Sequence, residues 1–225
     1  MESPVRRAVV AVLTLTLGAT IAFTRTSAAP APRQEKKDLT KPELFTETAP
    51  ATYLAQFDTS VGVFVVKVTR NWAPNAADRF YNLVKNGFYD ECRFFRVLTD
   101  NLAQFGINGN PKVSAAWDKA YIKPDRARMS NTRRRLSFAT TSDDQAKRTT
   151  QVFINYADNQ KIDLAGYAAF GEITTSMVVV QQIFDKYGPG PDQLMFMEKG
   201  NEWLKTAAPA LSYIKTATIA PDEKK

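Results

Sequence analysis

Short runs of β-prone residues, separated by turns, occur along much of this chain. Residues 53–57 and 63–69 are β-prone and are separated by a turn that contains Gly62, which is typical of a β-hairpin. Further β-prone stretches follow at residues 94–98, 136–139, 152–155 and 168–173. Many short strands with few helices predict a mainly β protein that closes into a barrel.

Two segments have helical periodicity instead. After Pro74, apolar residues recur at helical spacing as far as Val84, and Gly87 marks the expected end of this helix. A second helix is predicted over residues 177–187, where a Gly-Pro-Gly-Pro sequence ends it. We expect these two helices to cap the ends of the barrel.

The C-terminal residues 191–225 contain too many apolar side chains for a solvated tail. A short helix is predicted over residues 198–205, and a final strand over residues 210–219. We therefore expect a C-terminal extension that packs on the barrel.

The composition excludes several kinds of chemistry. The chain has 225 residues, of which 44% are hydrophobic, so we expect one sizeable core and one domain with tails. Histidine is absent, which removes Ser-His and Cys-His nucleophile pairs and all His-ligated metal sites. Cys92 is the one cysteine, so neither an intramolecular disulfide nor a multi-cysteine metal site can form, and a buried thiol is expected.

The N-terminal region has the layout of a secretory signal. Two arginines precede an uncharged apolar run at residues 8–23, and small residues follow it. The run is shorter than the roughly 20 residues of a membrane-spanning helix. We predict a signal peptide over residues 1–28, a flexible linker over residues 29–51, and a periplasmic or extracellular location. The alternative is an uncleaved leader that anchors the chain to the membrane.

The chain is basic, with a formal charge of +7. Part of the excess is clustered in one region, at Arg126, Arg128, Arg133, Arg134 and Arg135. No aromatic residues are interleaved with these arginines, and an exported protein seldom meets nucleic acid, so no nucleic-acid partner is expected. A solvated basic loop is the plain interpretation, and contact with an anionic polymer or lipid is the alternative.

Four stretches occur in an order and spacing that is more specific than any of them alone. They read FFRV at residues 94–97, LAQFG at 102–106, TTQVFIN at 149–155 and GYAAFG at 166–171. Together with the helix sequence at residues 73–84, they resemble the cyclophilin family of peptidyl-prolyl isomerases, in which the first stretch usually begins Phe-His-Arg. The resemblance covers residues 53–188.

The resemblance implies a closed antiparallel eight-stranded β-barrel capped by two α-helices, with the family domain at residues 52–190. It implies catalysis of rotation about Xaa-Pro bonds in proline-containing polypeptides, by an enzyme that we expect to be a monomer. Such a rotation needs no nucleophile, metal or cofactor, because the barrier of roughly 18 to 20 kcal/mol comes from amide resonance. The absence of histidine is therefore no obstacle, and no cofactor is expected.

The resemblance also assigns site residues. Arg96 matches the arginine that favours the twisted amide, Phe153 matches the floor of the proline pocket, and Gln104 matches a residue that binds the peptide backbone. The walls of this pocket and its adjoining groove correspond to Leu102, Ile162, Tyr167, Ala139 and Gln151.

Some positions depart from the family pattern. Asn101 stands where an aromatic residue usually forms a pocket wall, and Lys161 stands where relatives carry Trp or Phe. The loop at residues 141–148 is longer than usual, and Arg134 replaces a frequent Gly. These changes leave an alternative function open, in which the barrel has lost useful turnover and binds proline-containing segments or a partner protein.

Overall fold

The computed structural model describes residues 36–140, 144 and 146–220. The predicted signal peptide and the first part of the predicted linker lie outside the described residues, as does part of the loop at residues 141–148. Within the described part of the chain, no helix has the length and apolar character needed to cross a membrane.

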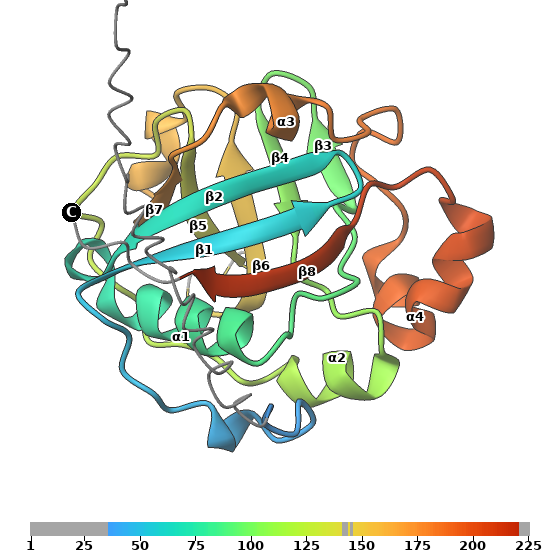
Figure 1. The fold of residues 1–225 in the computed structure, drawn as a ribbon, viewed down its shortest axis with the longest axis horizontal. Coiled ribbons are helices and arrows are strands. Elements are labelled where there is room, and N and C mark those ends of the chain that lie inside the picture. Colours follow the sequence, from blue (N-terminus) through green and yellow to red (C-terminus); the bar gives the residue numbers. More distant parts are fainter. Residues whose placement is uncertain (1–35, 141–143, 145, 221–225) are drawn as a thin grey trace, which may run out of the picture. The chain divides into compact units, whose positions relative to one another are not determined.

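Eight strands form one curled sheet in which every neighbouring pair is antiparallel, in the order β3-β4-β6-β5-β7-β2-β1-β8 (Figure 1). Their bounds are β1 Thr52–Thr59, β2 Gly62–Thr69, β3 Arg96–Leu98, β4 Leu102–Phe105, β5 Arg135–Thr140, β6 Arg148–Asn155, β7 Ala169–Ile173 and β8 Ile214–Ala220. The predicted mainly β, eight-stranded architecture is confirmed.

The two edge strands of the sheet, β3 and β8, do not pair as a ladder. The residues that precede them close the seam instead. Phe94 N donates to Ser212 O, and Ile214 N donates to Cys92 O, each at 2.9 Å. The sheet is therefore a half-barrel with a short backbone seam, because β3 has only three residues and cannot supply a longer ladder.

Helices cover the openings of the curled sheet. The helix α1 (Pro74–Lys85) packs against β6, β7 and β8, and α3 (Met177–Gln181) packs against β2. In Figure 1, α1 lies below the strands and α3 above them. The second predicted helix is shorter than expected, because the chain turns after residue 181.

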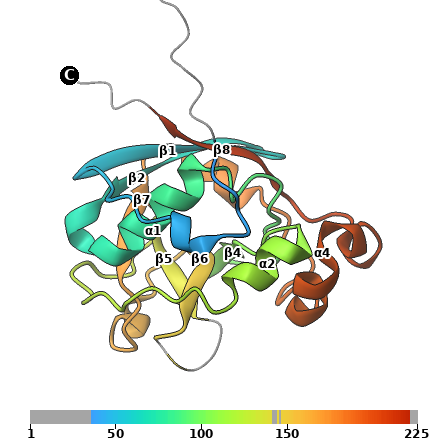
Figure 2. The same ribbon diagram turned by 90° about the horizontal axis from the view of Figure 1, so that it is seen from below.

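Two further helices differ from the sequence prediction, one in being unexpected and the other in its length. The helix α2 (Pro111–Trp117) was not predicted, because seven residues are too few to give a clear periodicity. The helix α4 (Gln193–Ala207) is longer than the predicted helix at 198–205, and it is broken at Gly200, whose φ is 65°. These two helices lie beside each other (Figure 2). Three short 3-10 helices complete the fold, η1 Pro42–Leu44, η2 Arg70–Trp72 and η3 Gln160–Asp163.

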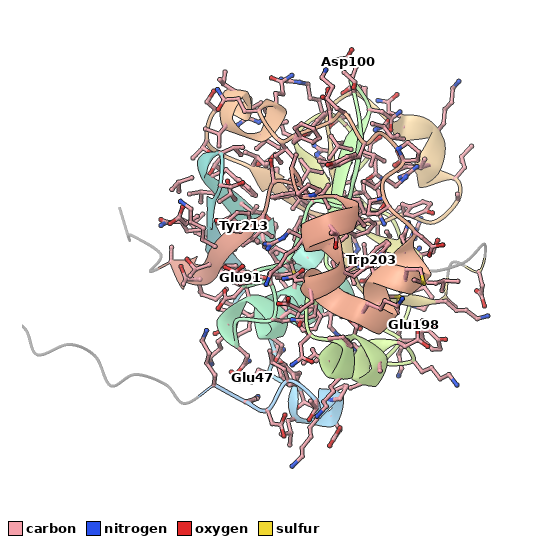
Figure 3. The ribbon with its side chains drawn as sticks, turned by 90° about the vertical axis from the view of Figure 1, so that its right-hand side faces the viewer. Glu47, Glu91, Asp100, Glu198, Trp203 and Tyr213 are labelled. Carbon is pink, nitrogen blue, oxygen red and sulfur yellow. The ribbon has the colours of Figure 1, made fainter. Side chains whose placement is uncertain are left out.

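The prediction of a flexible linker as far as residue 51 is wrong for residues 36–51. Phe45 and Ala49 are buried in the main core, and the Phe45 ring meets Trp117 edge to face at 5.0 Å. The Trp117 indole donates to the backbone oxygen of Leu39 at 2.7 Å. Figure 3 shows Glu47 of this segment at the lower edge of the domain. The few apolar residues of segment 36–51 follow neither a helical nor a strand period, so no sequence pattern indicated that this segment packs on the core.

Candidate functional site

Three residues from three strands lie in one row on the sheet. Arg96 of β3 is paired with Gln104 of β4, and Gln104 is paired with Phe153 of β6. Directly opposed residues of antiparallel strands project to the same face. Val97 and Ile154, which follow Arg96 and Phe153 along their strands, point to the opposite face and belong to the main core. The row therefore faces the outside of the sheet.

Hydrogen bonds fix the polar part of this row. The Arg96 guanidinium donates through Nη1 to Gln104 Oε1 at 3.2 Å, and Gln104 Nε2 donates to Gln151 Oε1 at 2.7 Å. Both glutamines are buried, at 6% and 5% exposure. A buried amide that is bonded at both ends has little freedom, so Gln104 holds the guanidinium in a defined position.

The row borders a cavity of about 710 Å³ on the outer face of the sheet. Its lining includes eight of the nine residues that the sequence assigns to the site, namely Arg96, Leu102, Gln104, Ala139, Gln151, Phe153, Ile162 and Tyr167. They come from strands β3 to β6, from η3 and from the segment before β7. The volume lies in the range of small-molecule binding sites.

Phe153 gives the cavity an apolar surface. Its side chain is only 4% exposed, yet it is not a member of the main core, to which its neighbours Val152 and Ile154 belong. The Phe153 ring meets Tyr167 edge to face, with centroids 5.7 Å apart and an interplanar angle of 72°. The aromatic pair therefore lines the same cavity as the Arg96 guanidinium, and a bound apolar ring could pack against it.

The wall that carries Ile162 is held by a buried amide. Asn131 is fully buried, and its Nδ2 donates to Asp163 Oδ1 at 2.7 Å and to the backbone oxygen of Tyr167 at 2.8 Å. Asp163 also accepts from the Ser130 hydroxyl and from the backbone N–H of Asn131. Burial raises the pKa of the Asp163 carboxyl group, but these hydrogen bonds and the charge of Arg135 outweigh it, so the pKa lies below its usual value.

We expect Asp163→Asn to lower the free energy of unfolding by about 1 to 2 kcal/mol near neutral pH, because it removes hydrogen bonds to a charged, partly buried group. The folded-state pKa is lowered, so this stabilisation is present above the usual pKa of 3.8 and is lost as the pH falls through the folded-state value. Urea unfolding of wild type and variant, at about pH 7 and about pH 3, measures the difference.

The exposed Glu198→Gln is the matched control for this comparison, since it also removes one carboxylate. An Asp163→Asn effect of equal size at both pH values would contradict the assigned role of the ionised carboxylate.

Asn101, the ninth residue that the sequence assigns to the site, is not among the residues that line the cavity. It is exposed on the turn between β3 and β4, where its backbone oxygen accepts from Tyr156 N at 2.8 Å and from Asn159 Nδ2 at 3.1 Å. Asp100, at the tip of this turn, has a φ of 59°, and Figure 3 shows it at the top of the domain. Lys161 is likewise exposed and absent from the lining.

Five lining residues were not predicted. Asp118 and Thr140 come from the end of α2 and from β5, and Gln193, Leu194 and Met197 come from α4. The α4 residues have the spacing i, i+1 and i+4, which places them on one helix face. Their apolar pattern predicts a helix that packs on the barrel, but it does not indicate which part of the barrel.

Most arginines of the basic cluster make bonds within the domain. Arg134 donates to the backbone oxygens of Ile173 and Thr175, and Arg135 donates to the backbone oxygen of Ser130. Arg128 and Arg133 donate to the side chains of Asn71 and Gln181. The predicted solvated loop is therefore wrong for Arg134 and Arg135, which are half-buried and tie the start of β5 to its surroundings, whereas Arg128 and Arg133 are exposed.

The thiol of Cys92 is fully buried, and burial raises the pKa of this group. Its Sγ donates to the Phe88 backbone oxygen at 3.5 Å, as expected of a structural cysteine. Among the residues that the structure describes, no three Cys, Asp or Glu side chains are gathered as metal ligands would be.

The family comparison agrees with the geometry of the site. A family model described as "Cyclophilin type peptidyl-prolyl cis-trans isomerase/CLD" matches residues 54–195. This match contains the strands and 3-10 helix that carry the Arg96, Gln104 and Phe153 row and its walls, but it ends within the first turn of α4.

Relatives and solved structures point the same way. The chain is 34% identical over 147 residues to a peptidyl-prolyl cis-trans isomerase of Acinetobacter baylyi, which covers 62% of this chain and 76% of the relative. It is 30% identical to peptidyl-prolyl cis-trans isomerase B of Escherichia coli, over 58% of this chain and 83% of the relative. A cyclophilin type peptidyl-prolyl cis-trans isomerase of Cryptosporidium parvum superposes with a TM-score of 0.58 at 16% identity, covering 76% of this chain and 99% of that structure.

Proposed function

This chain belongs to the family of cyclophilin-type peptidyl-prolyl cis-trans isomerases, and we propose that it uses the row of Arg96, Gln104 and Phe153 to accelerate rotation about Xaa-Pro bonds in unfolded, exported polypeptides. One observation carries the residue assignment. A guanidinium group and an aromatic floor lie in one row on one sheet face, on either side of Gln104, and border the same cavity.

In this mechanism the Phe153 and Tyr167 rings hold the pyrrolidine ring of the substrate, while Leu102 and Ile162 flank it. The prolyl amide loses its resonance as it twists, and its nitrogen becomes pyramidal and able to accept a hydrogen bond. The Arg96 guanidinium donates to this nitrogen or to the neighbouring carbonyl oxygen. Since the bond to nitrogen exists only in the twisted state, it stabilises the transition state more than the planar ground state.

Gln104 has a positioning role in this proposal. Its side-chain oxygen accepts from Arg96, and its side-chain nitrogen donates to Gln151. The guanidinium is therefore held in place before the substrate arrives, so little of the binding free energy is needed to order it.

The activity on whole polypeptides can be tested by refolding. At a concentration well below that of its substrate, the protein is expected to accelerate the slow phase of a protein whose refolding is limited by prolyl isomerisation, which takes tens to hundreds of seconds without a catalyst. A fast refolding phase that does not depend on proline is the control. A slow phase that stays unchanged, despite measurable binding of the unfolded chain, would support a binding module instead.

The location of the protein is also a proposal, and it rests on the leader sequence at residues 1–28. N-terminal sequencing of the protein from the extracytoplasmic fraction of producing cells is expected to begin near residue 29. We expect the same material to sediment as a monomer. An intact leader on protein that remains with the membrane would support an anchor instead.

A further inference from the structure

The helix α4 forms part of the wall of the substrate cavity. Gln193, Leu194 and Met197 all line it, together with Gln151 and Arg96 of the sheet. Met197 also borders a small adjoining cavity beside Gln151, so α4 lies at the end of the site where Gln151 is found. Leu194 is 73% exposed, so most of its apolar surface at the cavity rim is in contact with water.

The position of α4 is fixed by a hydrophobic cluster of its own. Phe196 is fully buried and packs with Phe95 and Ile107, with the rings of Phe95 and Phe196 6.1 Å apart. Phe95 immediately precedes Arg96 and stands where the family pattern has histidine. This departure from the pattern therefore provides the apolar contact that seats α4 beside the site.

Backbone contacts fix the far half of the helix. Asn201 N donates to Gly109 O at 3.0 Å, and Asn201 Nδ2 donates to the backbone oxygen of Glu91 at 3.0 Å. A Cβ at Gly200 would lie 2.2 Å from Gly109 O, so this close approach requires glycine. Figure 3 looks onto α4, on which Glu198 and Trp203 are labelled. The part of the cavity wall that α4 forms is therefore fixed to the rest of the domain.

The lining side chains of α4 have the chemistry of an apolar subsite. Leu194 and Met197 present aliphatic and thioether groups to the cavity, and methionine adapts to partners of different shape. The cavity of about 710 Å³ is larger than a prolyl ring needs, so it has room for residues next to the proline. A large apolar side chain of the substrate would remove the exposed Leu194 surface from water.

We propose that Leu194 and Met197 are specificity-determining residues that favour proline-containing segments with a large apolar side chain near the proline. This inference rests on the proposed function of the same site. It concerns a feature of this chain, because Met197 and the anchoring residues Phe196 and Asn201 lie beyond the family match, which ends at residue 195. The preferred substrate is thus an unfolded segment in which proline accompanies residues that a folded protein would bury.

The test uses peptides with one proline flanked by alanines, in which leucine replaces alanine at one position at a time on either side of the proline. For wild type, we expect leucine at one position to raise kcat/KM about tenfold over the all-alanine peptide, as is typical of a few methylene groups in an apolar site. In the double variant Leu194→Ser/Met197→Ser this ratio is expected to fall to within about twofold of unity.

Two variants control for indirect effects. The exchange Leu194→Met/Met197→Leu keeps an apolar wall and is expected to keep the ratio. Val178→Ser removes an apolar residue that is 60% exposed on α3, away from the cavity, and is expected to leave all rates unchanged.

Equal acceleration of all peptides by wild type, or an unchanged ratio in the serine double variant, would overturn the selectivity and leave the isomerase activity intact. Failure to accelerate any peptide would instead overturn the proposed function, and this inference with it.

Discussion

Replacing Arg96 by alanine is expected to lower kcat/KM for a proline-containing peptide by about 10-fold to 100-fold. Hydrogen bonds to charged groups contribute about 1.5 to 3 kcal/mol, and each 1.4 kcal/mol corresponds to a factor of ten in rate. Arg96 donates to Gln104 and borders the cavity, so its loss removes the one cationic side chain among the described residues that line it. A proline-peptide isomerisation assay measures the effect.

A second variant, Arg96→Lys, separates the effect of the positive charge from that of the donor geometry. Lysine keeps the charge but has no planar fork of donors, so it cannot both donate to Gln104 and address the amide with the same geometry. We expect it to recover only part of the lost rate. If Arg96→Ala isomerises peptides at the wild-type rate, the guanidinium has no part in catalysis and the proposed mechanism is wrong.

Replacing Phe153 by alanine is expected to lower kcat/KM by about 10-fold or more, because the site loses the apolar floor on which the pyrrolidine ring would pack. Full burial of a large apolar group contributes about 1.5 to 3 kcal/mol. The change is expected mainly in KM, which should rise, because a variant without this floor binds the peptide more weakly in both the planar and the twisted state.

Phe153 is only 4% exposed, so the alanine variant is also less stable, and the assay needs a measured unfolding curve at the same temperature. Phe153→Leu keeps an apolar floor with less loss of volume and is expected to retain most of the activity. A folded alanine variant with an unchanged KM would show that the ring packs elsewhere.

The fold and the central row of the site were predictable for different reasons. The strands were indicated by short β-prone stretches, and β1 and β2 also show the alternating burial of strands with one face on the core. Phe153 could not be assigned in this way, since β6 is buried along its whole length and shows no alternation. Only the order of motifs around it distinguished the outward Phe153 from the inward Val152 and Ile154.

The parts that escaped prediction depend on contacts between distant segments. Phe45 reaches the core by packing on Trp117, and no local pattern indicates a contact across more than seventy residues. In the same way, the sequence of α4 predicts a helix, but its seat is decided by Phe95 and Gly109. The motif position of Asn101 fits the pocket, but the sequence does not indicate that its backbone oxygen ties the turn to the segment after β6.

The backbone seam between residues 91–94 and 212–214 affects when the enzyme becomes competent during its own synthesis. The segment just before Arg96 forms backbone hydrogen bonds with residues that leave the ribosome more than a hundred positions later. The strand β1 likewise pairs with β8, which is synthesised last among the strands. Pairing across such long separations slows folding. A nascent chain that ends before β8 therefore lacks the support of its catalytic strand, so activity should emerge only once almost the whole polypeptide has been made.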